Sequence, residues 1–149
     1  MVIAEPSSSL ISAEQYRKFS KPYLEKLIGE VGLDAVLHIC GRSGHLIREM
    51  VETKARAISI DQNVPLGLAI NSVPKDVLVF GNYPPSNLIF ENIKTIEENV
   101  RKMVEDVKDR RNYVASTGCD VPSSAPIESV KAFIESCKKF RRDSLSTST

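Results

Sequence analysis

Short apolar segments alternate with amphipathic segments along this chain, and that alternation limits the folds open to it. The apolar segments are residues 35–40, 57–61, 77–82 and 113–116, and they have the near-continuous hydrophobic composition of strands buried on both faces. The segments 13–28, 44–53, 65–71, 93–108 and 127–140 instead repeat their apolar residues at helical spacing. We therefore expect an α/β fold, in which helices cover a parallel sheet.

The first predicted helix carries clear end signals. Ser12 can cap its N-terminus, because Gln15 stands three residues later in the capping-box position. Pro22 lies within the pattern and predicts a kink or a break, since proline cannot donate the helical hydrogen bond. Gly29 or Gly32 is expected to end the helix.

The composition argues against several classes of function but does not identify one. The chain has 149 residues, enough for one domain, and we assign residues 1–140 to it and residues 141–149 to a disordered polar tail. A formal net charge of +1 gives no electrostatic support for binding nucleic acid or an anionic membrane. No apolar run approaches the roughly 20 residues of a membrane span. Three cysteines without framework spacing indicate a reducing compartment, so we expect a cytoplasmic protein.

Two potential metal ligands lie in the segment 35–40. His38 and Cys40 are two residues apart, so in a strand they project from the same face, while Leu37 and Ile39 face the opposite way. Imidazole and thiolate are the ligands that zinc prefers, and Cys119 follows the last predicted strand as a possible third ligand. The alternative is structural, because buried cysteine is common and chemically inert.

Other polar side chains share the same predicted edge of the sheet. Glu5, Asp61 and Asn82 each stand at the C-terminal end of an apolar segment, as His38, Cys40 and Cys119 do. Parallel β/α folds build their active sites at this edge, whereas scattered structural residues have no reason to gather there. The clustering favours a functional site.

The segments that carry these residues resemble a known family. The sequences LHICG (37–41), ISID (58–61), FGN (80–82), STGCDVP (116–122) and PIESVKA (126–132) are similar, in this order, to signatures of the uroporphyrinogen decarboxylase superfamily. Within it, the H-x-C motif with a distant cysteine resembles the zinc motif of the methylcobamide:coenzyme M methyltransferases. The similarity covers nearly the whole of residues 2–140.

The resemblance implies a (β/α)8 barrel, of which this chain matches the C-terminal half, with about four β/α units. Its first residues resemble the end of the fourth strand, and residues 113–119 resemble the eighth. A complete barrel needs about 200 to 250 residues. A half barrel has open strand edges and an open interior, so we expect a homodimer or a complementing N-terminal half; a truncated or decayed copy is the alternative.

The resemblance also implies a reaction, in which a methyl group passes from a methylcobamide, free or on a corrinoid protein, to a small thiol such as coenzyme M. His38, Cys40 and Cys119 would hold Zn²⁺ and leave one position for the substrate thiol. Asp61 is our candidate for a fourth, catalytic ligand, and Glu5 is a second candidate. Asp61 serves equally well as a helix cap or as a partner that orients His38.

Four further residues have weaker signals. Asn82 is a candidate for binding substrate or a phosphate-like group, or for holding the loop backbone. Arg42 beside the site is a candidate for attracting an anionic substrate tail, or is simply solvated. His45 is expected to be exposed or to cap a helix, and Cys137 to be a partly buried helix residue.

Two other functions compete with methyl transfer. A porphyrinogen decarboxylase relative would need no metal, so the H-x-C motif and the distant cysteine speak against it. A half barrel without catalytic activity, acting as a subunit or a remnant, would retain the metal ligands without turning over substrate alone.

Overall fold

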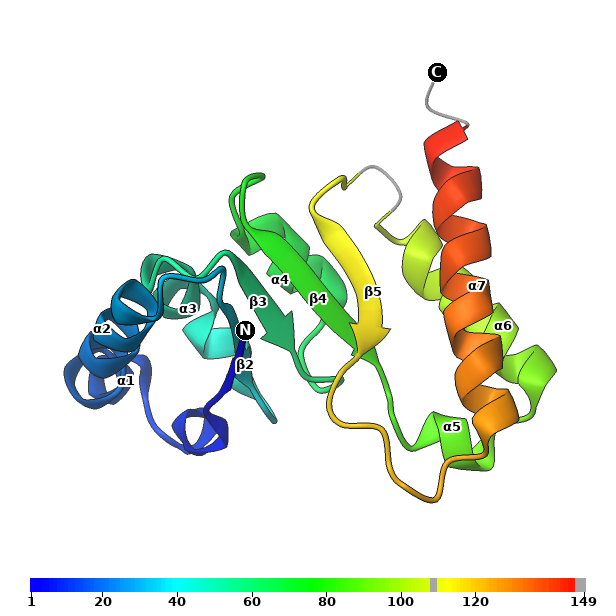
Figure 1. The fold of residues 1–149 in the computed structure, drawn as a ribbon, viewed down its shortest axis with the longest axis horizontal. Helices are drawn as coiled ribbons and strands as arrows, with labels where there is room; N and C mark the ends of the chain where they lie inside the picture. The colour runs from blue at the N-terminus through cyan, green and yellow to red at the C-terminus, as the bar shows by residue number, and fades with distance from the viewer. Residues whose placement is uncertain (108–109, 147–149) are drawn as a thin grey trace.

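A computed structural model describes residues 1–107 and 110–146, and it contains one parallel sheet. The strands are β1 (Val2–Ala4), β2 (Val36–Ile39), β3 (Ala57–Ile60), β4 (Leu78–Tyr83) and β5 (Tyr113–Thr117). Each strand pairs in parallel with the next along the chain, in the order β1-β2-β3-β4-β5 (Figure 1). A sequential, all-parallel order with intervening helices is that of a β/α barrel, so the predicted half barrel is confirmed.

Helices fill the connections between the strands. The short 3-10 helices are η1 (Pro6–Leu10) and η2 (Ser43–Leu46). The α-helices are α1 (Ala13–Phe19), α2 (Lys21–Val31), α3 (Ile47–Glu52), α4 (Leu66–Ser72), α5 (Asn87–Phe90), α6 (Ile93–Glu105) and α7 (Ile127–Ser146). No helix among these described segments is both long enough and apolar enough to cross a membrane.

The end signals of the first helical segment act as the sequence predicts. Ser12 and Gln15 form the reciprocal capping box at the start of α1. The helix breaks at Ser20, and Pro22 lies in the first turn of α2, where its missing N–H leaves no helical bond unmade. Gly32 ends α2 with a φ of 64°, a left-handed conformation that favours glycine.

Three elements differ from expectation. The three serines at 7–9, whose composition indicates a loop, lie within η1, and α5 has no counterpart in the prediction, because four residues are too few to show a period. Helix α7 continues past Phe140 to Ser146, so the predicted tail is helical in its first part. Its last residues, 147–149, lie outside the described residues, as does residue 108 of the predicted helix 93–108.

The main core lies between the sheet and the helices α1 to α4. Leu37 and Ile39 of β2 are fully buried in it, as predicted for the face opposite His38. The helices contribute Tyr16, Leu24, Ile47, Met50, Ala69 and Ile70 to this cluster.

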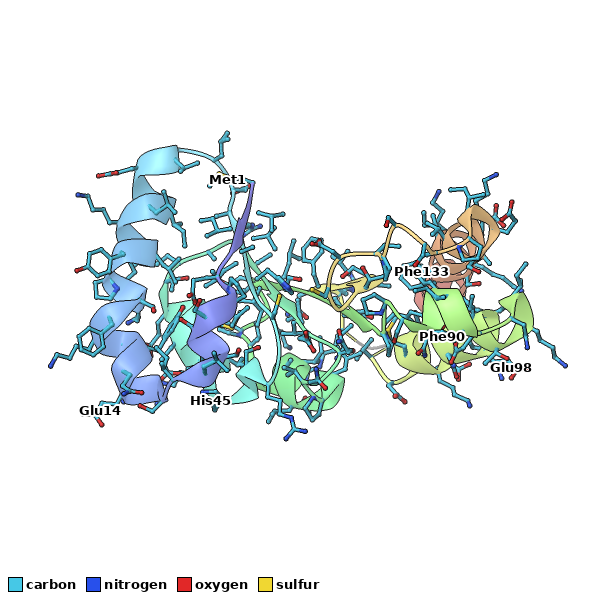
Figure 2. The ribbon with its side chains drawn as sticks, turned by 90° about the horizontal axis from the view of Figure 1, so that it is seen from below. Met1, Glu14, His45, Phe90, Glu98 and Phe133 are labelled. Carbon is cyan, nitrogen blue, oxygen red and sulfur yellow. The ribbon has the colours of Figure 1, made fainter. Side chains whose placement is uncertain are left out.

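A second core joins the end of β4 to the last three helices. Tyr83 and Phe133 stack with ring centroids 5.1 Å apart, and Leu88, Ile96, Val100 and Val104 pack with them. In Figure 2, Phe133 lies at this end of the molecule, whereas Glu14 and His45 mark the end formed by α1 and η2. The two cores fix opposite flanks of the sheet and leave its inner face open.

Candidate metal centre

The three predicted metal ligands come together at the C-terminal edge of the sheet. His38 lies near the end of β2, Cys40 follows that strand directly, and Cys119 follows β5. In strand order β2 and β5 are separated by β3 and β4, yet the Cys40 and Cys119 sulfurs are 3.5 Å apart. The curvature of the sheet, combined with the loop after β5, therefore brings the distant cysteine to the H-x-C motif.

The distances within this group suit a tetrahedral metal. His38 Nε2 lies 3.0 Å from Cys40 Sγ, and the three donor atoms all lie within 4.8 Å of one another. Two zinc–sulfur bonds of about 2.3 Å at a tetrahedral angle place their sulfurs roughly 3.8 Å apart, close to the spacing of the two cysteines. The donors fit Zn²⁺ with small side-chain adjustments, and three protein ligands leave one position for another ligand.

A hydrogen bond fixes which nitrogen of His38 faces the thiols. Nδ1 lies 3.2 Å from the carbonyl oxygen of Ser59 and 3.1 Å from its hydroxyl. The carbonyl can only accept, so Nδ1 carries the proton and donates it, which leaves the lone pair of Nε2 free to bind a metal. Ser59 is the register partner of His38 on β3, so strand pairing itself orients the imidazole.

Two glycines permit the close approach of the loops that carry the cysteines. Gly41, directly after Cys40, has a φ of 78°, and a Cβ there would lie 3.2 Å from Ser9 Oγ. A Cβ on Gly118, directly before Cys119, would lie 2.4 Å from the backbone nitrogen of Gln62. Only glycine lets the loop after β5 rest against the loop after β3, and this contact positions Cys119.

The surroundings of Cys40 favour its protonated thiol. Burial raises the pKa of Cys40 to about 11, and the hydrogen bond and charge of Cys119 and the carboxylates of Asp61 and Asp120 act in the same direction. A divalent cation at this point would reverse the effect, because a coordinating thiol is deprotonated by the metal.

Two of the three donor residues line a hollow of about 230 Å³ on the inner face of the sheet. Its lining includes His38 and Cys119, the apolar side chain of Phe80, and the hydroxyl-bearing Ser59, Ser116 and Thr117. A small substrate in this hollow would lie directly beside the donor group.

The carboxylates of Asp61 and Glu5, the two further candidate ligands, accept hydrogen bonds from residues close in the sequence. Asp61 is buried, and its Oδ1 accepts hydrogen bonds from the backbone and side chain of Asn63 at 2.8 and 2.6 Å. Glu5 caps η1 by accepting from the backbone nitrogen of Ser8 at 3.2 Å. Neither belongs to the group of donors within 4.8 Å, so their roles as ligands remain predictions.

Asn82 and Arg42 also lie at this edge. The Asn82 amide donates to the carbonyl oxygens of Asp61 at 3.1 Å and Val64 at 2.6 Å, so it holds the loop after β3. Arg42 is exposed at the start of η2. Their predicted binding of substrate remains a prediction.

Sequence reasoning did not single out Ser59, Gln62 or Gly118 for their roles at the site. A serine inside a strand looks like any half-buried residue, and Gly118 stands out only as part of the STGCDVP segment. Ser59 stands two residues before Asp61, on the face that His38 shares. The two-residue spacing between Ser59 and Asp61 within one strand is the sequence signal that points to Ser59.

Comparison with known proteins agrees with this architecture. Residues 1–140 match the family described as "Uroporphyrinogen decarboxylase (URO-D)". A solved structure of a methyltransferase from Methanosarcina mazei superposes with a TM-score of 0.82 at 24% identity, over 93% of this chain and 41% of that one.

The individual relatives include proteins named as methyltransferases and proteins named as decarboxylases. The methylcobamide:CoM methyltransferase MtbA of Methanosarcina mazei is 30% identical over 146 residues, covering 95% of this chain and 42% of the relative. The uroporphyrinogen decarboxylase of Dichelobacter nodosus is 30% identical over 121 residues, covering 80% of this chain and 35% of the relative. The chain thus spans less than half the length of these relatives. The family match over residues 1–140 shows that this chain belongs to the uroporphyrinogen decarboxylase family.

Proposed function

We propose that this chain supplies the zinc-binding half of an enzyme that transfers a methyl group from a methylcobamide to a small thiol such as coenzyme M. The observation that carries the proposal is the group formed by His38 Nε2, Cys40 Sγ and Cys119 Sγ, within 4.8 Å of one another and beside the hollow on the inner face. Relatives named as methylcobamide:CoM methyltransferases support it.

Each residue has a defined part in this proposal. His38, oriented through Nδ1 by Ser59, presents Nε2 to the metal, while Cys40 and Cys119 bind as thiolates. Zinc, when bound there, supplies an open position at which a substrate thiol loses its proton and becomes nucleophilic. The hollow lined by Phe80 and Ser116 holds the body of the thiol beside that position.

Asp61 and Glu5 are the candidates for a fourth ligand before substrate arrives. The Asp61 carboxylate is held by Asn63, so ligation would require its other oxygen or a small rotation. Glu5 follows β1, and its backbone nitrogen donates to the His38 carbonyl oxygen at 2.9 Å, which keeps the residue at the site edge. Asn82 would support the Asp61 loop, and Arg42 would attract a negatively charged end of the thiol substrate.

The open sheet points to further strands that complete the site. β1 and β5 are the terminal strands of the five-stranded order, and the inner face bears the metal ligands. A barrel of eight strands needs three more, so we propose a complementing N-terminal half as the partner, with a homodimer as the alternative. The donor of the methyl group would be a free methylcobamide or a corrinoid protein. We place the protein in the cytoplasm, where its thiols stay reduced.

The direct test is a methyl-transfer assay with methylcobalamin and coenzyme M, run on zinc-loaded protein with and without a separately produced N-terminal half from a relative. We expect loss of the cobalt–methyl absorbance and formation of methyl-coenzyme M only when both halves and zinc are present. Zinc binding without turnover under every combination would favour a non-catalytic half barrel. Decarboxylation of a porphyrinogen without zinc would instead favour the decarboxylase activity named for other relatives.

A further inference from the structure

The two cysteines of the metal centre are also close enough to react with each other. Cys40 Sγ and Cys119 Sγ are 3.5 Å apart, and both residues are partly exposed rather than sealed in the core. A disulfide requires its sulfurs to approach to about 2.05 Å, a movement that rotation of the two side chains can supply. We propose that this pair is an oxidative modification site, which closes to a disulfide when the metal is absent.

The two sulfurs differ in access. Cys119 lines the hollow of about 230 Å³ on the inner face, whereas Cys40 is not part of that lining and lies against His38 Nε2. We therefore assign the first reaction with a small oxidant such as hydrogen peroxide to Cys119, which faces the hollow. Cys40 is then in position to react with the product.

The chemistry balances with peroxide as the only co-reactant. Cys119 sulfur attacks one peroxide oxygen, the O–O bond breaks, and the products are a sulfenic acid on Cys119 and one water. Cys40 sulfur then attacks the Cys119 sulfur, and the sulfenic hydroxyl leaves with the Cys40 proton as a second water. Two thiols are oxidised to one disulfide, and one peroxide is reduced to two waters.

Oxidation and metal binding exclude each other at this site. The metal needs both sulfurs as thiolates, and a disulfide removes two of the three donors while leaving His38. Bound metal conversely holds both sulfurs as ligands, so the disulfide can form only after the metal leaves. The disulfide would join positions separated by 79 residues, connecting the end of β2 to the loop after β5. It would therefore restrain the unfolded chain and raise the melting temperature of the metal-free protein.

Substitution of the third cysteine, Cys137, gives a protein in which only the two thiols under test remain. Cys137 lies on α7 and packs against the second core, away from the donor group. A Cys137→Ala protein therefore retains only the two thiols under test, and a count of free thiols becomes a direct readout. The Cys119→Ser variant in the same background removes the partner of Cys40.

The experiment treats chelator-stripped Cys137→Ala protein with one equivalent of hydrogen peroxide. Free thiols, peptide masses without reductant, and zinc uptake are then measured, before and after dithiothreitol. We expect both thiols to be lost, a peptide pair joining residues 40 and 119, and zinc uptake that disappears and returns on reduction. Zinc-loaded protein should keep its thiols under the same treatment, and Cys119→Ser should form no internal disulfide.

Other results would overturn the inference. Cys119 recovered as a sulfinic acid beside a free Cys40 thiol would show that the pair cannot close. Disulfides formed only between chains, or thiols that stay intact, would do the same. The inference stands apart from the proposed function: a disulfide in a protein that takes up no zinc when reduced would contradict only the metal centre, and zinc uptake without a disulfide would contradict only the modification site.

Discussion

Gly118 lies so close to Gln62 that a Cβ on the glycine would stand 2.4 Å from the Gln62 backbone nitrogen and 3.1 Å from the Asp61 carbonyl carbon. This contact joins the loop after β5 to the loop after β3. Because Cys119 is the next residue, the position of the third metal ligand depends on a glycine that touches no metal itself.

Gly118→Ala should therefore weaken metal binding. Backbone atoms cannot move aside as a flexible side chain can, so the loop and Cys119 must shift. We expect at least a tenfold loss of zinc affinity, the scale seen when residues around a metal site are disturbed, together with about 1–3 kcal/mol lower stability. Chelator competition and chemical denaturation measure the two effects.

Gly67→Ala is the matched control for that variant. Gly67 lies on α4, and a Cβ there would meet nothing within 4 Å. The change should leave zinc affinity unaltered and stabilise the helix by up to about 1 kcal/mol. Equal losses of affinity in the two variants would contradict the role assigned to the Gly118 contact.

Ser59→Ala should have a smaller effect on zinc affinity than its position beside His38 suggests. The substitution removes the hydroxyl 3.1 Å from Nδ1 but keeps the backbone carbonyl at 3.2 Å, which is enough to hold the tautomer. We expect a loss of less than about tenfold in zinc affinity, whereas His38→Ala should abolish tight binding. A loss in Ser59→Ala as large as that in His38→Ala would mean that the hydroxyl orients the ring.

Asn82→Ala should lower stability without removing the metal centre. The amide of Asn82 donates to two backbone carbonyls of the loop after β3, at 3.1 and 2.6 Å. Leaving these acceptors without their donor should cost about 1–3 kcal/mol. Asn82→Asp should cost more, because a carboxylate would face the same two oxygens. Urea denaturation gives the stabilities, and retained zinc stoichiometry in Asn82→Ala would separate this structural role from ligation.

Cys137 should resist alkylation in the folded protein. Burial raises the pKa of Cys137 to about 12 from a usual value of 9.0. At pH 8, below both values, the thiol is protonated in the folded state, and the reactive thiolate is about a thousandfold scarcer than in an exposed cysteine. Iodoacetamide labelling should become fast only on unfolding. Rapid labelling of native protein at residue 137 would show that α7 detaches from the second core.

Much of this fold follows from local patterns in the sequence. The four apolar segments became β2 to β5, and Pro22 broke the first helical segment between α1 and α2. The H-x-C spacing placed His38 and Cys40 on one face because a strand alternates its side chains. Local rules did not predict α5, which is too short to show a period, nor the continuation of α7 past Phe140.

Contacts between segments that are distant in the sequence account for the features that sequence patterns did not predict. The contact of Asn82 with the loop after β3 depends on where two segments distant in the sequence meet in space. The contact of Gly118 with Gln62 is of the same kind. Sequence patterns predict which residues lie at the edge of the sheet. Which of these residues face the metal ligands depends on how the loops pack.

Zinc stoichiometry on purified, reduced protein is the sharpest test of the metal centre. It is best measured by elemental analysis on Cys137→Ala and Cys119→Ser protein in parallel, because both variants remove one thiol but only the second removes a ligand. We expect about one tightly held zinc per chain in Cys137→Ala and a loss of that zinc in Cys119→Ser. A folded Cys137→Ala protein that binds no zinc, or a Cys119→Ser protein that binds it as tightly, would contradict the metal centre and the methyl transfer proposed from it.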